Sequence, residues 1–317
     1  MNTLSGLHHV TAICSDAQKN LDFYCGTLGL RLVKLTVNFD DPFAYHLYYG
    51  DELGRPGTVL TFFAWSGGAP AQHGNRVVAA TAFAVPVGAL EWWKTHLTSK
   101  NIEWTTPPAR WGEEVIQFHD FDGLVLEIIA TPRAESGFAW ENGAVPAQYA
   151  IRGFHSVTIA AEGYEHTAQL LGGAMGFRNA ETPSLLEPHR FRFEVGQGIG
   201  GVVDVACLPD APRATTGAGG VHHVAFRVAD GAAQTRFRVE LVRAGFNASP
   251  VMDRSYFHSI YFREPGGVLF EIATDSPGFA VDESVERLGS MLQLPSQLER
   301  YRAQIEARLP PLQLPSS

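Results

Sequence analysis

Two pairs of adjacent histidines and one glutamate carry the clearest chemical signal in this sequence. His8 and His9 lie in GLHHVTAI, His222 and His223 lie in GVHHVAF, and Glu271 lies in VLFEIAT. A carboxylate in an otherwise apolar strand is costly unless it is paired or bound to a metal. Two imidazoles and one carboxylate form a three-ligand face that leaves positions open, as in non-haem Fe(II) enzymes that activate O₂. These residues predict a metal centre.

Only one histidine of each pair can face the same metal, because successive strand side chains point to opposite faces. The strand pattern alone does not say which one. Imidazole and carboxylate ligands without a nearby cysteine fit iron or manganese better than structural zinc. We therefore expect Fe(II), with Mn(II) or another divalent ion able to replace it in a purified sample.

The elements that must position these residues come from one unit written four times. Each unit has an opening strand, a helix-like segment and further β-rich stretches that close on a Gly-containing turn and an apolar strand. In the second unit, Leu90, Trp93 and Leu97 recur at helical spacing. The four βαβββ modules cover about residues 7–65, 76–132, 153–209 and 221–275.

This repetition predicts an α+β fold in which the four modules pair into two cup-shaped, barrel-like sheets. We expect an N-terminal domain over residues 1–150 with the first two modules, a C-terminal domain over 151–280 with the last two, and a helical tail over 281–317. If His9, His223 and Glu271 converge, the first and fourth modules share one cup and the second and third share the other.

The second cup offers an incomplete set of ligands. Superposing the repeats places His155 with His9 and His223, although its string GFHSV allows alignment with either member of a pair, and places Glu127 with Glu271. We expect this cup to be structural, with a second site at Glu127 and His155 as the alternative. At the place of Glu271, the first module has Phe62 and the third has only Asp204 or Val205 nearby.

Composition excludes several classes of function. The 317 residues are 45% hydrophobic and carry a formal net charge of −9 without a Lys/Arg cluster, which argues against a nucleic-acid partner. No signal-peptide pattern and no apolar run long enough to cross a membrane are present. The three cysteines are odd in number and lack CxxC spacing, so the expected location is the cytoplasm. The sequence leaves the oligomeric state open and allows a homo-oligomer.

The four-module layout, with His on opening strands and Glu on a closing strand, resembles the vicinal-oxygen-chelate superfamily, which includes glyoxalases and extradiol dioxygenases. The chain is more closely similar to the ring-cleaving hydroquinone 1,2-dioxygenases of the chlorohydroquinone and methylhydroquinone type. Beside GLHHVTAI, GVHHVAF and PGGVLFEIAT, the string YHLYYGDELGRPGT at 45–58 carries this resemblance and is more specific than either His pair.

The resemblance implies roles for particular residues. It favours His9 and His223, each followed by an apolar residue, as metal ligands with Glu271. It implies that Arg254 and Tyr261 surround the substrate, where Arg254 would stabilise negative charge and Tyr261 would hydrogen-bond a reacting oxygen. It also implies that His8, Thr11 and His222 assist. Whether one of these histidines takes a substrate proton or orients a ligand stays open.

The implied activity is Fe(II)-dependent cleavage of a hydroquinone ring with insertion of both atoms of O₂. The hydroxyls of hydroquinone are para, so only one can reach the metal and protein groups must hold the other. The expected partners are thus a small aromatic substrate and O₂. The alternatives are a catechol-type extradiol dioxygenase, a glyoxalase-like isomerase, and a non-enzymatic protein that binds aromatic ligands or drugs.

Overall fold

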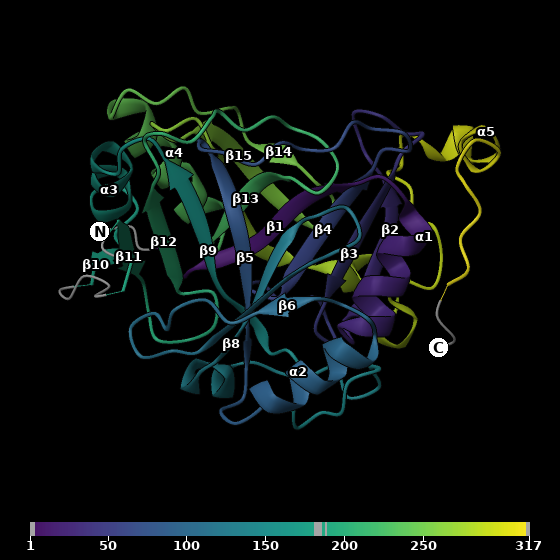
Figure 1. Ribbon diagram of the computed structural model, residues 1–317. Coiled ribbons are helices and arrows are strands. Elements are labelled where there is room, and N and C mark those ends of the chain that lie inside the picture. The colour runs from purple at the N-terminus through teal and green to yellow at the C-terminus, as the bar shows by residue number, and fades with distance from the viewer. Residues whose placement is uncertain (1–3, 181–185, 188, 315–317) are drawn as a thin grey trace.

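Each repeated unit folds as a strand, a helix and three further strands, and the units combine into two eight-stranded mixed sheets (Figure 1). The structure is a computed structural model that describes residues 4–180, 186, 187 and 189–314. The predicted fold class, with two curved sheets built from four modules, is confirmed.

The first sheet combines the first and fourth modules, as convergence of the predicted metal ligands requires. Its strands, in spatial order, are β14 (Met252–Asp253), β15 (Phe257–Arg263), β16 (Leu269–Pro277), β13 (Val221–Val228), β1 (Leu7–Cys14), β4 (Val59–Ala64), β3 (Tyr45–Gly50) and β2 (Arg31–Val37).

The second sheet combines the third and second modules in the same way. Its strands are β10 (Arg178–Asn179), β11 (Arg190–Glu194), β12 (Val202–Cys207), β9 (Gly153–Ala161), β5 (Val77–Val85), β8 (Val125–Ala130), β7 (Val115–His119) and β6 (Trp104–Thr105). Each sheet therefore draws strands from both sides of the boundary expected near residue 150, and the division into two domains at that point stays a prediction.

Two glycines allow the sheets to meet closely at the start of opening strands. Gly6 and Gly153 have φ values of +109° and +132°. A Cβ on Gly6 would lie 2.7 Å from the carbonyl oxygen of Gly200, and one on Gly153 would lie 2.8 Å from that of Gly57. Only glycine adopts this conformation without strain, so these positions set the junction from which the histidine-bearing strands begin.

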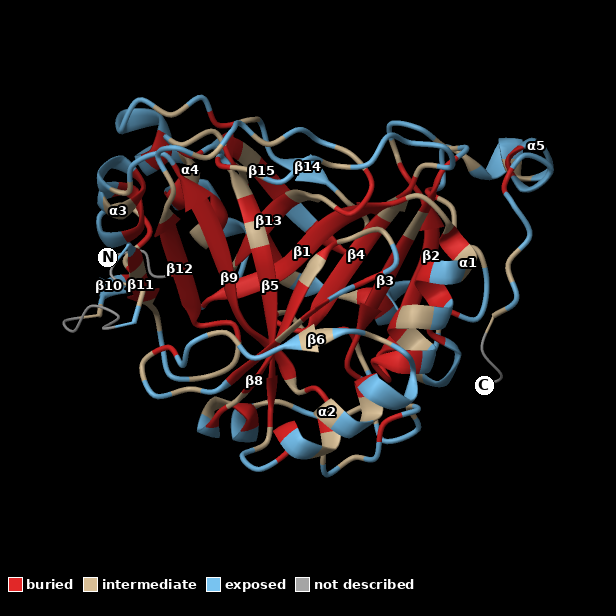
Figure 2. Ribbon diagram, in the orientation of Figure 1, coloured by how far each residue is buried: buried red, intermediate tan, exposed pale blue. Residues whose placement is uncertain are grey.

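Four of the helices pack against the sheets, with buried and exposed sides, and the last belongs to the C-terminal tail (Figure 2). The helices are α1 (Ala17–Leu21, continued by a π-helical segment Asp22–Thr27), α2 (Leu90–Ser99), α3 (Glu165–Gly172), α4 (Gly231–Arg243) and α5 (Arg302–Glu306). The predicted apolar stripe of α2 buries Leu90, Trp93 and Leu97. Among the described residues, no helix combines the length and apolar character needed to cross a bilayer.

The tail after Phe279 is mostly not helical, which corrects the expectation of a helical tail. It contains α5 and three short 3-10 segments, Phe279–Val281, Val285–Arg287 and Glu299–Tyr301. Prolines at 295, 310 and 311 limit longer helix, because proline lacks the backbone donor that a helix interior needs.

Candidate metal centre and active site

Both histidine pairs lie where the antiparallel strands β1 and β13 shift register by one residue. The extra residue is His8 on β1 and His222 on β13. Such a bulge leaves one residue unpaired and re-aims its side chain. His8 and His222 are thus equivalent to each other, and His9 and His223 are equivalent to each other, as the sequence repeat predicts.

Three ligand atoms meet at the centre of this sheet. Glu271 Oε2 lies 3.0 Å from His223 Nε2 and 3.3 Å from His9 Nε2, and the two Nε2 atoms are 3.3 Å apart. Ligands about 2.1 Å from a metal lie about 3.0 Å apart at a right angle and about 3.4 Å apart at a tetrahedral angle. The triangle therefore has the size of one face of a metal's coordination shell.

All three side chains are buried, and within the described part of the chain they form the single group of three or more His, Cys, Asp or Glu residues close enough to share a metal. Burial pushes the pKa of Glu271 up. The adjacent imidazoles of His9 and His223 outweigh that effect, so the pKa lies well below its usual value and the carboxylate is ionised.

Hydrogen bonding fixes the tautomer of His9. The carbonyl oxygen of Thr274 can only accept, so His8 Nε2, 3.1 Å away, donates to it. Burial, and next His9, lower the pKa of His8 to about 3, so His8 is neutral and its Nδ1 is an acceptor. His9 Nδ1, 2.9 Å from that atom, must then carry a proton, which leaves Nε2 as the ring nitrogen that faces Glu271 and is available to a metal.

This arrangement tests whether the residues fit a cation. In the neutral form in which an imidazole binds a metal, His9 Nε2 and Glu271 Oε2 are both acceptors, and that oxygen is buried without a hydrogen-bond partner. Two acceptors facing each other in a buried site are unfavourable unless a cation lies between them. The donor set of two imidazoles and one carboxylate thus fits a divalent transition metal.

His222 differs from His8 in its access to solvent and ligands. Its Nδ1 atom lies 2.8 Å from His223 Nδ1, matching the other pair. His222 is only partly buried and lines a cavity, whereas His8 does not line it. Burial and the neighbouring His223 lower the pKa of His222 to about 4, so it presents a neutral imidazole.

Arg254 and Tyr261 lie together beside His223 and Glu271. Tyr261 on β15 is the register partner of Glu271, and its ring centroid lies 5.9 Å from that of His223. Arg254 Nε donates to Tyr261 Oη over 3.0 Å. Burial, and next Glu271, raise the pKa of the Tyr261 phenol, which therefore keeps its proton.

A cavity of about 290 Å³ opens in front of the ligands. Of the residues predicted from the sequence, all except His8 and Glu271 line it. Its other walls come mostly from aromatic side chains: Phe39, Tyr48, Phe63, Trp65 and Phe257. Flat apolar walls with a few polar groups at fixed places are typical of a site for a small aromatic molecule.

One histidine outside the predicted set belongs to this site. His46 on β3 lines the cavity; its Nε2 atom lies 2.9 Å from Thr61 Oγ1 and its Nδ1 atom lies 2.9 Å from Tyr48 Oη. Thr61 Oγ1 lies 2.8 Å from the hydroxyl of Thr11. The sequence feature that pointed to His46 was the 45–58 string, in which His46 and Tyr48 are two residues apart and so share one face of a strand.

The registers correct two equivalences expected from the repeats. On β16, Glu271 pairs with Ala225, and the matching pair in the first module is Thr11 with Thr61, so Thr61 stands where Phe62 was expected. The expectation fails because the first closing strand is offset by one residue, and such an offset changes the face.

In the second sheet, the bulge falls at His155, which therefore corresponds to His8, while Ser156 occupies the place of His9. Aligning His155 with His9 and His223 was wrong. Ala80 stands in the place of His223, because it pairs with Thr158 as His223 pairs with Thr11. The second sheet thus lacks an imidazole at both ligand positions.

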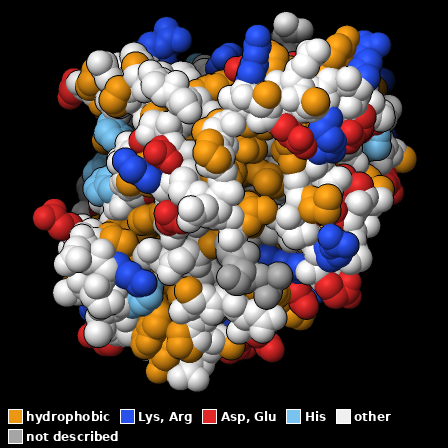
Figure 3. Space-filling model, turned by 90° about the vertical axis from the view of Figure 1, so that its right-hand side faces the viewer, with side chains coloured by type: hydrophobic (Ala, Val, Ile, Leu, Met, Phe, Trp, Pro, Cys, Tyr) orange, Lys and Arg blue, Asp and Glu red, His pale blue; other side chains and the backbone are white. Residues whose placement is uncertain are grey.

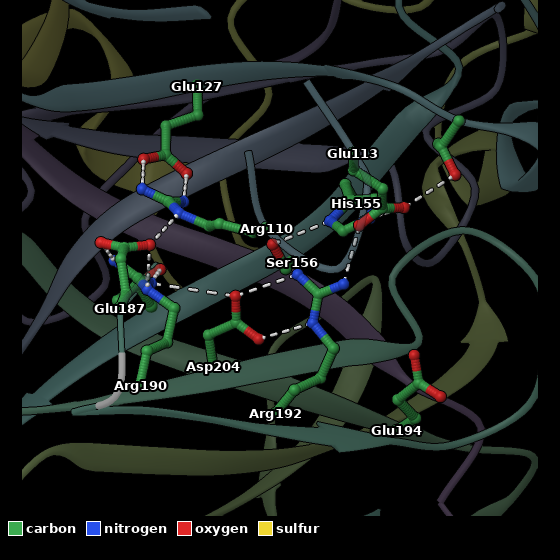
Figure 4. A network of polar contacts seen from close by, with 12 residues as sticks. Arg110, Glu113, Glu127, His155, Ser156, Glu187, Arg190, Arg192, Glu194 and Asp204 are labelled. Carbon is green, nitrogen blue, oxygen red and sulfur yellow. Dashed lines mark hydrogen bonds and ion pairs between the residues drawn. The ribbon is translucent and has the colours of Figure 1, made fainter. Parts of the chain in front are cut away.

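In the second sheet, the buried carboxylates are neutralised by arginines (Figure 4). Glu127, the counterpart of Glu271, accepts two bonds of 2.7 and 3.0 Å from Arg110, and Asp204 accepts two of 2.9 and 3.1 Å from Arg192. His155 Nε2 lies 3.0 Å from a Glu113 carboxylate oxygen. These contacts support the structural interpretation of the second cup.

A larger cavity, of about 1110 Å³, lies away from the cavity beside His9 and His223. It is lined by residues of the first helix, the 140–144 segment and the C-terminal tail, among them Cys25, Arg31, Trp140 and Leu288. The face beside α1 and the C-terminus has hydrophobic side chains between groups of charged ones (Figure 3). No residue predicted to act in the metal site lines this cavity.

Known proteins share both the fold and the sequence of this chain. Residues 6–128 match the family model described as the glyoxalase/bleomycin resistance protein/dioxygenase superfamily. Maize glyoxalase I has the same fold, with a TM-score of 0.61 at 13% identity over 86% of this chain and 92% of that one. This likeness concerns the fold alone.

Three relatives match over almost the whole length. "Putative ring-cleaving dioxygenase MhqO" of Bacillus subtilis is 44% identical over 98% of this chain and 97% of its own. Chlorohydroquinone/hydroquinone 1,2-dioxygenase of Sphingobium indicum is 36% identical over 95% of each. The crystal structure of a "putative dioxygenase" from Bacillus subtilis superposes with a TM-score of 0.94 at 42% identity over 99% of both chains. The chain therefore belongs to the glyoxalase/bleomycin resistance protein/dioxygenase superfamily and, within it, to the ring-cleaving dioxygenases.

Proposed function

We propose that this protein is an Fe(II)-dependent dioxygenase that cleaves the ring of a hydroquinone, substituted or not, and inserts both atoms of O₂. The observation that carries the proposal is the buried triangle of His9, His223 and Glu271 at the base of an aromatic-walled cavity. The full-length relative named chlorohydroquinone/hydroquinone 1,2-dioxygenase supports the choice of substrate class.

His9, His223 and Glu271 would hold the metal, and His8 would orient His9 through the bond between their Nδ1 atoms. A bound Fe(II) would supply the redox chemistry that lets O₂ react with the ring. Because the protein supplies only three ligands, other coordination positions of the metal would be left for substrate and O₂.

The cavity residues would bind the substrate and move its proton. Arg254, held at Nε by Tyr261, offers positive charge to a phenolate, and Tyr261 offers a protonated hydroxyl. His222 lines the cavity as a neutral imidazole, so it is placed to accept the hydroxyl proton, while the enclosed His8 acts on ligand orientation.

The reaction adds O₂ to the quinol without loss of atoms. The bond between a hydroxylated ring carbon and its neighbour breaks, one oxygen atom goes to each carbon, and the product is a carboxylic acid with an aldehyde. A chlorine on the second carbon would give an acyl chloride instead. We infer the hydroquinone class over catechol because the cavity has polar groups, His46, Tyr48 and Arg254, beyond the metal ligands.

A glyoxalase-like isomerase is the weaker alternative. Thr61, an uncharged residue, stands at the position related to Glu271, so the first module supplies no second carboxylate ligand. A three-ligand face leaves more positions open for exogenous ligands than a four-ligand one, which suits O₂ activation.

The test is oxygen consumption after anaerobic loading with Fe(II). We expect uptake of one O₂ per ring with hydroquinone, methylhydroquinone or chlorohydroquinone, and two labelled oxygen atoms in the product when ¹⁸O₂ is used. Faster turnover of catechol would overturn the substrate class, and absence of Fe(II)-dependent uptake with every quinol and catechol would overturn the activity. Location in the cytoplasm and assembly into a homo-oligomer stay predictions from the sequence.

A further inference from the structure

Four side chains form a continuous hydrogen-bonded chain along one wall of the cavity. Tyr48 Oη lies 2.9 Å from His46 Nδ1, His46 Nε2 lies 2.9 Å from Thr61 Oγ1, and Thr61 Oγ1 lies 2.8 Å from Thr11 Oγ1. Tyr48, His46 and Thr11 line the cavity, and Thr61 is fully buried behind them. Both ends of the chain therefore face the space where a substrate would lie.

The hydrogen-bonded chain occupies, in the first module, the positions that correspond to Glu271 and its neighbours in the fourth module. Tyr48 pairs with Thr61 on β3 and β4 as Tyr261 pairs with Glu271 on β15 and β16. Ser259 hydrogen-bonds Glu271 from the position that His46 occupies beside Thr61. The first module thus has an uncharged hydrogen-bonding group where the fourth has a metal ligand.

The direction of these bonds is constrained because each contains one hydrogen. Burial, and next His223, hold the pKa of His46 well below its usual value, so the ring is neutral with one donor and one acceptor nitrogen. If Tyr48 donates to Nδ1, the protons run toward Thr11, whose hydroxyl is free to donate into the cavity. If His46 Nδ1 donates to Tyr48, the protons run the other way and Tyr48 donates into the cavity.

Each arrangement therefore offers the cavity one donor at one end and acceptor capacity at the other. Interconversion takes up one proton at one end of the hydrogen-bonded chain and releases one at the other, so the His46 tautomer changes while the total charge does not. A hydroxyl oxygen can donate or accept, and the carbonyl oxygen that an enol becomes after ring opening can only accept. The chain can satisfy both.

We propose that this chain binds the substrate oxygen that lies away from the metal ligands, and that His46 is the positioning residue that sets its donor and acceptor ends. The inference rests on the proposed function and deepens it, because a para-diol is the substrate class that presents such a second oxygen. Tyr48 and Thr11 would make the contacts, and His46 and Thr61 would act through them.

The test compares anaerobic binding of hydroquinone and phenol, which differ by the second hydroxyl, to the Fe(II)-loaded protein by calorimetry. In the unsubstituted protein we expect the Kd of phenol to exceed that of hydroquinone roughly tenfold, as for loss of one good hydrogen bond. His46→Phe keeps a ring next to Tyr48 and Phe63, and Thr61→Val keeps the shape of the side chain. Both variants are expected to bring the ratio of the phenol Kd to the hydroquinone Kd close to one.

Two matched variants separate hydrogen bonding from packing. Thr61→Ser restores the hydroxyl and should recover most of the ratio lost in Thr61→Val. Thr81→Val makes the same substitution at a buried strand threonine of the other sheet, whose hydroxyl has no partner, and should leave the ratio unchanged. The double variant His46→Phe/Thr61→Val should lose no more than the stronger single one, because the chain acts as a unit.

An unchanged ratio in both His46→Phe and Thr61→Val would overturn the inference, as would equal affinity of the unsubstituted protein for hydroquinone and phenol. Oxygen uptake by the unsubstituted protein, measured in parallel, distinguishes this failure from failure of the proposed function. If the unsubstituted protein turns over quinols but the Kd ratio is unaffected in the variants, only the proposed role of the hydrogen-bonded chain is refuted. If no quinol is turned over, the dioxygenase activity is refuted.

Discussion

Glu271 and Glu127 stand at equivalent places in the two sheets and meet opposite surroundings. Glu271 Oε2 faces the Nε2 atoms of His223 and His9 at 3.0 and 3.3 Å, whereas both oxygens of Glu127 accept bonds from Arg110. A buried carboxylate requires a positive partner. In the second sheet Arg110 is that partner, whereas in the first sheet the residues around Glu271 could hold a metal ion in that place.

The two glutamates should respond oppositely to the same substitution. Glu271→Gln is expected to abolish tight metal binding and O₂ uptake while the metal-free fold keeps its stability, because a buried charge is removed. Glu127→Gln should retain metal binding but lose on the order of 3 kcal/mol of unfolding free energy, because buried Arg110 loses one of its two ionic partners and keeps only Glu187. Metal titration and chemical denaturation of both variants check this pair, and equal metal affinity in both would contradict it.

Removing His8 should weaken the metal site without touching the cavity. His8→Ala takes away the acceptor that orients His9, so we expect metal affinity to fall roughly 10- to 100-fold. The comparison is His119→Ala, an exposed histidine at the end of β7, which should bind metal normally. Competition with a chelator measures both, and undiminished affinity in His8→Ala would refute the orienting role.

Tyr261 should matter for turnover more than for metal binding. Tyr261→Phe removes the hydroxyl that accepts from Arg254 Nε, and we expect kcat to fall roughly 10- to 100-fold with unchanged metal affinity. In an Arg254→Lys background the same change should cost less, because the two groups act together. Steady-state oxygen uptake of the four proteins gives the coupling, and strict additivity would show that they act separately.

Asp120 should give the stability a distinct pH dependence. Burial raises its pKa from 3.8 to about 6, against opposing hydrogen bonds from Leu124 N and Tyr24 Oη. A raised carboxyl pKa means that the stabilising contribution is present below about pH 4 and lost as the pH rises through 6. The expected loss is about 3 kcal/mol.

The measurement is denaturant unfolding at several pH values between 4 and 7. Asp120→Asn cannot titrate, so its stability should change less with pH in this interval than that of the unsubstituted protein. Parallel curves for the two proteins would show that another group causes the dependence.

The repeat, the fold class and the candidate set of two histidine pairs with Glu271 could be predicted from the sequence, and the family resemblance favoured His9 and His223 within the pairs. The reason is that strand periodicity and internal repetition are local properties: HHV in two opening strands and Glu271 in an apolar closing strand are visible without coordinates. The pairing of the first module with the fourth followed from requiring these residues to meet.

Long-range strand pairing sets which residues of the modules are equivalent and which groups complete the site. The bulges at His8, His222 and His155 arise between strands far apart in sequence, and a shift of one residue exchanges the two faces of a strand. This is why Ser156, not His155, corresponds to His9. The contact of His46 with Thr61 is likewise a cross-strand relationship, which the order of residues along one strand does not specify.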